Sequence, residues 1–128
     1  MNREAMDRMS AKELDAYAKV LGIDLRGAKG AKRKAEVIAA RRERCAEMTV
    51  LGIELEIPIR RAHDKRVSDL LGGNRTDADM VEALGLLLGE EQFEAVEAAC
   101  TEDDGVFDVE AFAYAAAAII GSPELKNF

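Results

Sequence analysis

The sequence predicts a mainly α-helical protein with a minor β-strand or hairpin, built as a helix–loop–helix head followed by a small helical body. Three observations support this fold class. Of the 128 residues, 48% are apolar and only 5% are aromatic, a composition typical of packed helices when Ala, Leu and Glu abound. Only two prolines interrupt the chain. Apolar residues also recur at helical spacing along most of its length.

Residues 1–47 are expected to form the head. Ser10, followed by Glu13, has the pattern of a capping box and predicts the start of a helix. Gly22 predicts its end, because glycine readily adopts the left-handed conformation that closes helices. An extended connection then leads to a second helix, predicted from about Ala31 to Glu47.

Residues 48–128 are expected to form the body, which begins with a strand. Over residues 53–57 apolar side chains alternate with glutamates, and Pro58 closes the run. This pattern predicts one short, half-buried strand, or one arm of a short hairpin that turns at Gly52.

Helices are expected to complete the body. A short helix is predicted over residues 64–71. Thr76 is a suitable cap for a longer helix, which Gly89 is expected to break before it resumes. Asp108 predicts the start of a last helix over residues 109–120, and the tail beyond it is expected to be loose.

Charge is divided unevenly between the two parts. Residues 1–47 carry 12 Lys and Arg against 8 Asp and Glu, whereas residues 48–128 carry 6 against 17. A basic head on an acidic body indicates two surfaces with different partners.

Six basic residues are predicted to cluster at the start and on the exposed face of the second head helix. Cations at this position neutralise phosphates, and free helix N–H groups add to an anion site. The alternative is a solvated helix face, whose charge Glu36 and Glu43 partly cancel. The nucleic-acid-binding candidates are Lys29, Lys32, Arg33, Lys34, Arg41 and Arg42.

Catalytic, cofactor and metal sites are not expected. The single histidine, His63, has no serine or cysteine beside it in a recognisable nucleophile setting, so a structural or surface role is favoured. Cys45 and Cys100 are far apart and form no metal-binding motif, which favours two reduced thiols. The charged N-terminus and the short apolar runs also argue against a signal peptide or a membrane span, and predict an intracellular protein.

Consecutive leucines are candidates for an interaction surface. Leu86, Leu87 and Leu88 cannot all lie on one narrow helical stripe. Burial of all three by neighbouring helices is the favoured interpretation, and the other is that one of them, with Leu84 or Phe93, lines a groove for a protein partner or a self-association surface.

The head resembles the SAP-like and Rho-N-terminal-like helix–extended-loop–helix modules. The resemblance lies in Glu13-Leu14, in Leu21-Gly22-Ile23, in Gly27, and in Lys34-Ala35-Glu36-Val37-Ile38 with Arg41. Such modules often bind DNA or RNA, and some are protein adaptors. This sequence departs from the pattern in its longer, lysine-rich connection before Lys34. The resemblance implies an alternative function for the chain, as a small nucleic-acid-binding protein.

The body resembles the tail assembly chaperones of long-tailed bacteriophages. The resemblance lies in residues 53–58, 65–71 and 108–112, in Lys126-Asn127, and above all in residues 86–95, LLLGEEQFEA. It implies a non-enzymatic chaperone that binds the tape measure protein and delivers it to the tail tube protein, in the host cell cytoplasm and with self-association. This is the first function that the sequence indicates.

Overall fold

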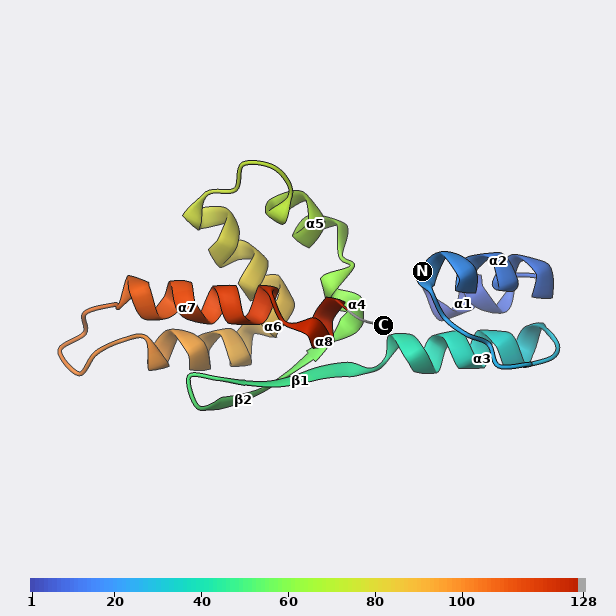
Figure 1. Cartoon of the computed structure of the whole chain (residues 1–128), viewed down its shortest axis with the longest axis horizontal. Coiled ribbons are helices and arrows are strands. Elements are labelled where there is room, and N and C mark those ends of the chain that lie inside the picture. Colours follow the sequence, from blue (N-terminus) through green and yellow to red (C-terminus); the bar gives the residue numbers. More distant parts are fainter. Residues whose placement is uncertain (127–128) are drawn as a thin grey trace. The chain divides into compact units, whose positions relative to one another are not determined.

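A computed structural model describes residues 1–126 and divides the chain into two compact units, the first over Met1–Arg44 and the second beginning at Cys45. Within the described residues there are eight helices and one two-stranded antiparallel sheet (Figure 1). The mainly α fold class with a minor β-hairpin is therefore confirmed. The boundary between the units falls after Arg44 rather than after residue 47.

The first unit contains helices α1 (Arg3–Asp7), α2 (Ala11–Leu21) and α3 (Ala31–Arg42). Helix α1 is an addition to the two predicted helices. The caps of α2 are as expected, since the Ser10 hydroxyl accepts a hydrogen bond from the backbone N–H of Glu13 at 3.1 Å and Gly22 is left-handed with φ of 70°. The core of this unit consists of Met6, Leu14, Ala18, Ile23, Ala35 and Ile38.

A hairpin begins the second unit, with strands β1 (Cys45–Val50) and β2 (Ile53–Pro58). Of the two alternatives, the hairpin that turns at Gly52 is therefore confirmed within the described residues, and the predicted helix to Glu47 is wrong beyond Arg42. Pairing with β2 explains the difference, because it buries Ala46 and Val50 on the inner face of the sheet. Such burial outweighs the local helix propensity of Ala, Glu and Met.

Five helices follow: α4 (Ile59–Ala62), α5 (Lys65–Leu71), α6 (Asp77–Ala99), α7 (Val109–Ile120) and α8 (Pro123–Lys126). The predictions of α5, α6 and α7 are confirmed, whereas α4 and α8 were not expected. The prediction of a loose tail is wrong for residues 123–126, because Leu125 is only 6% exposed and anchors α8. Residues 127 and 128 lie outside the described residues.

Within the second unit, the helices pack on one face of the hairpin. Helix α6 contacts β2, α7 and α8 contact β1, and α5 lies along α6. Figure 1 shows α7 running back beside the second half of α6 after the loop that joins them. The core between these elements includes Leu55, Ile57, Leu84, Val96 and Ile119, each at most 1% exposed. The apolar inner face of the hairpin is thus covered, and its outer face is left to solvent.

Candidate functional site

Helix α6 is broken at Gly89, as the sequence predicts. This residue has φ of 78° and ψ of 165°, and the helical backbone stops and restarts there. A side chain at this position would be strained, and its Cβ would lie 3.0 Å from the Arg61 guanidinium. The break divides α6 into a first half that pairs with α5 and a second half that runs beside α7.

Side chains bind the backbone groups near this break. The Arg61 guanidinium donates to the Leu87 carbonyl at 3.3 Å, and the Gln92 amide donates to the Leu88 carbonyl at 2.7 Å. Interrupting a helix leaves such carbonyls without their usual partners. Arg61 and Gln92 therefore stabilise the bend and fix the direction of the first half of α6.

Gln92 also ties α6 to the hairpin. Its carboxamide accepts a hydrogen bond from the Glu56 backbone N–H at 2.8 Å and donates one to the Glu56 carbonyl at 2.9 Å. These two bonds pair with backbone groups on the edge of β2 that faces away from β1, as a third strand would. The position of α6 relative to the sheet is thus set by a side chain that sequence reasoning did not single out.

An apolar groove opens on the helical side of the second unit. Its cavity volume is about 650 Å³, and helices α4 to α8 all contribute to its walls. The apolar members of the lining are Ala62, Val67, Leu71, Met80, Leu87, Ala117, Ile120 and Leu125, with Gly121 at the end of α7. Several of them, including Leu71, Met80 and Ile120, are half-buried, so they remain accessible from the groove.

The predicted leucine surface is largely core. Leu84, Leu87 and Leu88 are at most 2% exposed, which favours the interpretation that neighbouring helices bury these side chains. Leu87 nevertheless forms part of the floor of the groove. Leu86 is half-buried and does not line it. Phe93 is half-buried and packs edge-on against Phe112, with ring centroids 6.3 Å apart.

Most of the groove lining was missed by sequence reasoning. It brings together residues from Ala62 to Leu125, which lie on five helices. The helical spacing of Met80 with Leu84 and Leu87 was visible, but the convergence of α5, α7 and α8 on that face depends on the bend at Gly89 and on α8, which was not predicted.

Two basic residues, His63 and Arg75, are the charged or titratable members of the described lining. Among the other cations of α4 and α5, Arg60 is exposed and lies outside the lining, whereas Arg61, Lys65 and Arg66 are bound within the unit. Lys65 lies 2.6 Å from the Asp69 carboxylate, and Arg66 lies 2.7 Å from that of Asp64. The Arg66 side chain, together with its backbone N–H, lowers the pKa of Asp64 below its usual value. Among residues 1–126, by contrast, no hydrogen bond or ion pair engages Arg75.

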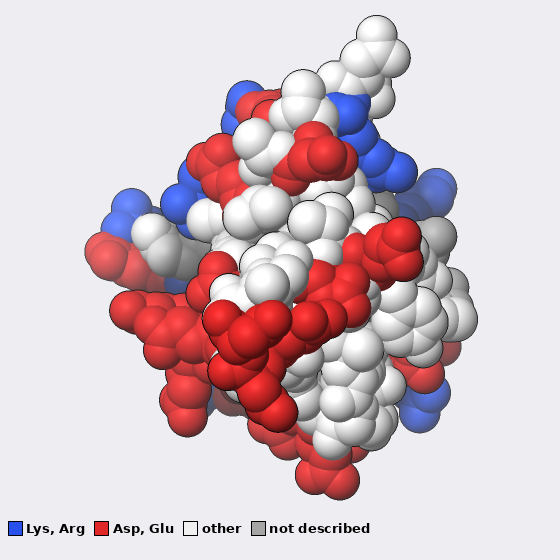
Figure 2. Space-filling model, turned by 90° about the vertical axis from the view of Figure 1, so that its left-hand side faces the viewer, with Lys and Arg blue, Asp and Glu red and all other residues white. Residues whose placement is uncertain are grey.

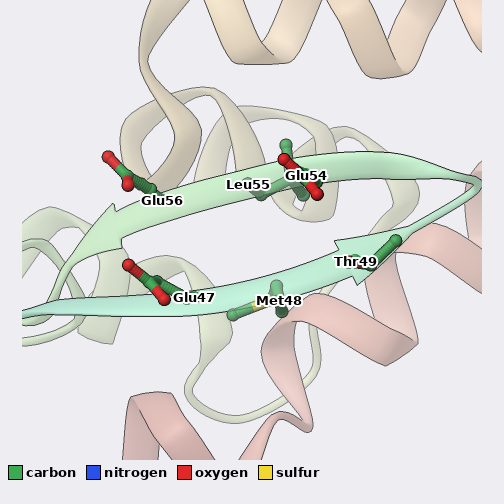
Figure 3. A pocket seen from close by; sticks show the side chains of 6 residues that line it. All are labelled: Glu47, Met48, Thr49, Glu54, Leu55 and Glu56. Atoms are coloured by element: carbon green, nitrogen blue, oxygen red, sulfur yellow. The ribbon is translucent and has the colours of Figure 1, made fainter.

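The outer face of the hairpin is acidic. Glu47 and Glu56 lie directly opposite each other in the register, and Glu54 lies opposite Thr49 (Figure 3). These residues surround a shallow hollow of about 320 Å³. Within the described part of the chain, no three His, Cys, Asp or Glu side chains are grouped to hold a metal ion. Like charges placed directly opposite weaken a hairpin, so this face is electrostatically strained.

Acidic residues also gather at the end of the second unit that carries the α6–α7 loop. Figure 2 shows this end, where Asp and Glu side chains form bands around uncharged surface. The loop contains Glu102, Asp103 and Asp104, and Val106 is 54% exposed beside them. The acidic character of the body, which the sequence predicts, is thus evident at this end of the unit.

The basic candidates in the first unit have different surroundings. Lys29, Lys32 and Arg33 are exposed at the start of α3, where Gly30 provides no side-chain cap. Lys34 is bound to the Asp15 carboxylate at 2.7 Å and is largely shielded. Arg41 and Arg42 are half-buried at the other end of α3, and Arg42 donates to the Met1 carbonyl at 3.2 Å. The structure therefore leaves the first three exposed at the start of α3, with the Arg33 guanidinium 3.4 Å from the Glu36 carboxylate.

The two cysteines are in different environments. Cys45 is exposed at the start of β1, whereas Cys100 is buried at the end of α6. Burial, together with the nearby Asp108 carboxylate, raises the pKa of the Cys100 thiol. The Cys100 thiol is therefore held in its neutral form, which is the less reactive one.

Comparison with protein-family models, with curated proteins and with solved structures gave no match. Within the described residues, no helix is both long and apolar enough to cross a membrane.

Proposed function

We propose that this chain is a tail assembly chaperone of a long-tailed bacteriophage, which binds helices of the tape measure protein and delivers them to the tail tube protein in the host cytoplasm. The resemblance of residues 48–128 to that family suggests the partner. The single observation that carries the proposal is the apolar groove of the second unit, bordered by α5, α6, α7 and α8.

The chemistry of the groove favours a helical occupant. Its walls are helices, whose backbone groups are already hydrogen-bonded internally. An extended segment placed there would bury N–H and C=O groups without partners, which is costly. An amphipathic helix satisfies its own backbone and places its apolar stripe against Leu71, Met80 and Ile120. Binding is then reversible and requires no reaction.

Blocking the groove tests the proposal. Ala117 lines the groove and is exposed, so Ala117→Trp fills the groove without replacing a core side chain. Ala95→Trp is the matched control, because Ala95 is exposed on the second half of α6 and outside the groove. Each variant is co-expressed with a tape measure protein encoded next to this chain's gene.

The wild-type chain and Ala95→Trp should keep the tape measure protein soluble and co-purify with it, whereas Ala117→Trp should not. Circular dichroism confirms that both variants are folded. Equal rescue by all three chains, or rescue by none, would contradict the proposal.

A second function, binding of nucleic acid by the first unit, is supported by the exposed trio Lys29, Lys32 and Arg33 at the uncapped start of α3. Affinity for a DNA duplex should fall steeply with salt, with a slope set by the number of phosphates contacted. The variant with Lys29, Lys32 and Arg33 changed to Gln should lose this binding. Arg3→Gln and Arg8→Gln on α1 are the controls, because these arginines pair with Asp7 and Glu4.

A further inference from the structure

We infer that the groove selects an amphipathic helix that carries a carboxylate beside its apolar stripe, and that Arg75 is the residue that binds this carboxylate. The inference rests on the proposed function, because it specifies the client that the groove accepts. The occupant is thereby defined by its chemistry as an acidic, amphipathic helical segment of another protein.

Within the described part of the second unit, Arg75 combines an open guanidinium with a place in the groove lining, whereas Arg60 is exposed outside the lining. Arg61 is bound to the Leu87 carbonyl, Lys65 to Asp69 and Arg66 to Asp64. Arg75 follows α5 in the connection to α6, is exposed, and has no partner among residues 1–126. It is nevertheless part of the lining of an otherwise mostly apolar groove.

The lining provides no carboxylate that Arg75 could bind when the groove is filled. Its described members are apolar apart from His63 and Arg75. Of the two acidic residues that follow Arg75 most closely, Asp77 is exposed outside the lining and Asp79 accepts a hydrogen bond from the Thr76 backbone N–H at 2.9 Å. An occupant that covers the groove also removes water from the guanidinium. That loss is compensated only if the occupant supplies an acceptor, for which a carboxylate is the best match.

The overall charge of the unit helps to distinguish a local contact with Arg75 from general electrostatic attraction. Asp and Glu greatly outnumber Lys and Arg from residue 45 onward. The long-range field of the unit therefore attracts basic peptides and repels acidic ones. A preference for an acidic helix is opposite to this field and can arise only from a local contact in the groove.

The test uses two synthetic peptides of about 18 residues, long enough to form a helix. They share a Leu and Ala stripe and differ only in the residues that flank it, which are Glu in one and Lys in the other. Binding to the full chain is measured by fluorescence anisotropy near physiological salt, where exposed charges beyond about 8 Å are largely screened. The wild-type chain should bind the Glu peptide about tenfold more tightly.

Arg75→Glu should reverse this preference, so that the Lys peptide binds more tightly. Arg60→Glu is the matched control, because Arg60 is also exposed and has no ion pair among residues 1–126, but does not line the groove. It makes the same change in net charge and should preserve the preference for Glu. Arg75→Lys should retain the sign of the preference with a smaller ratio.

The outcomes separate the two claims. If both peptides bind equally to the wild-type chain and Ala117→Trp abolishes both, the role of Arg75 is overturned while the groove function stands. If neither peptide binds, or if Ala117→Trp leaves binding unchanged, the groove function fails as well. Light scattering should give the same mass for the wild-type chain alone and for Ala117→Trp alone. A dimer that Ala117→Trp dissociates would overturn the inference by showing that a second copy fills the groove.

Discussion

The side chain of Gln92 pairs with the backbone of Glu56 through two hydrogen bonds, 2.8 Å from the Glu56 N–H to Oε1 and 2.9 Å from Nε2 to the Glu56 carbonyl. The same Nε2 donates to the Leu88 carbonyl at 2.7 Å. One carboxamide thus joins the edge of the hairpin to the bend of α6. The bend places the first half of α6 along the groove, so Gln92 supports the candidate site although it does not line it.

Gln92→Ala should lower the free energy of unfolding by about 1–3 kcal/mol, because it leaves backbone groups of Glu56 and Leu88 without their partners. Urea denaturation followed by circular dichroism measures this change. Glu94→Ala on the same half of α6 is the control, since Glu94 is exposed and its side chain forms no hydrogen bond or ion pair among residues 1–126. Equal midpoints for the two variants would show that the Gln92 bonds contribute nothing to stability.

Two glycines in α6 should respond in opposite directions to the same substitution. Gly89→Ala should destabilise the protein by about 1–2 kcal/mol or more, because φ is 78° there and the added Cβ meets Arg61. Gly85 lies within the helix with open space around its Cβ position, so Gly85→Ala should stabilise by about 0.5–1 kcal/mol. Thermal or urea unfolding measures both. Stabilisation by Gly89→Ala would mean that α6 is continuous.

Removing one member of the Glu47–Glu56 pair should strengthen the hairpin. Glu47→Thr abolishes the direct cross-strand repulsion and introduces a residue suited to strands, for a gain of about 0.2–1 kcal/mol at low salt. Added salt should shrink this gain. Glu54→Thr is the control, because Glu54 faces Thr49 rather than a carboxylate. The prediction fails if Glu54→Thr gives the same gain as Glu47→Thr with the same salt dependence.

The Asp64 carboxylate should raise the free energy of unfolding by an amount that depends on pH. Its carboxylate accepts from the Arg66 side chain and backbone N–H, and these bonds lower its pKa in the folded state below the usual 3.8. The contribution is therefore present above about pH 4 and is lost as the pH falls through the lowered pKa. Asp64→Asn keeps a good helix cap but removes the charge. Stability curves of the two proteins should differ at pH 7 and converge below pH 4; a constant difference at all pH values would exclude this linkage.

Local signals in the sequence were enough for most of the helices. Ser10, Thr76 and Asp108 each cap the helix that was assigned to them, and Gly22 and Gly89 interrupt helices as expected. These predictions succeed because capping and left-handed glycines act over a few residues. Strand β1 was predicted only as part of one of two alternatives, for the opposite reason. Ala46, Met48 and Val50 alternate with Glu47 and Thr49, but Ala, Glu and Met also favour helix, and pairing with β2 decides between the two conformations.

The candidate site was predicted less well than the fold. The expectation of an apolar protein-binding surface pointed to Leu84, Leu86, Leu87, Leu88 and Phe93, of which Leu87 alone lines the groove. The rest of the lining comes from helices that meet only in three dimensions, including the short α8. The exposed basic residues at the start of α3 were anticipated more fully, because Lys29, Lys32 and Arg33 are close in sequence and need only the start of α3 to place them.

The bend at Gly89 has a kinetic consequence. Because Arg61 and Gln92 hold it through bonds within the second unit, the groove exists before any client arrives. Under the proposed function, encounter with a client then requires little rearrangement of this chain, and the lifetime of the complex depends on how slowly the client helix leaves. Changes at the rim of the groove should therefore alter the time that a client is held much more than the speed with which it is captured.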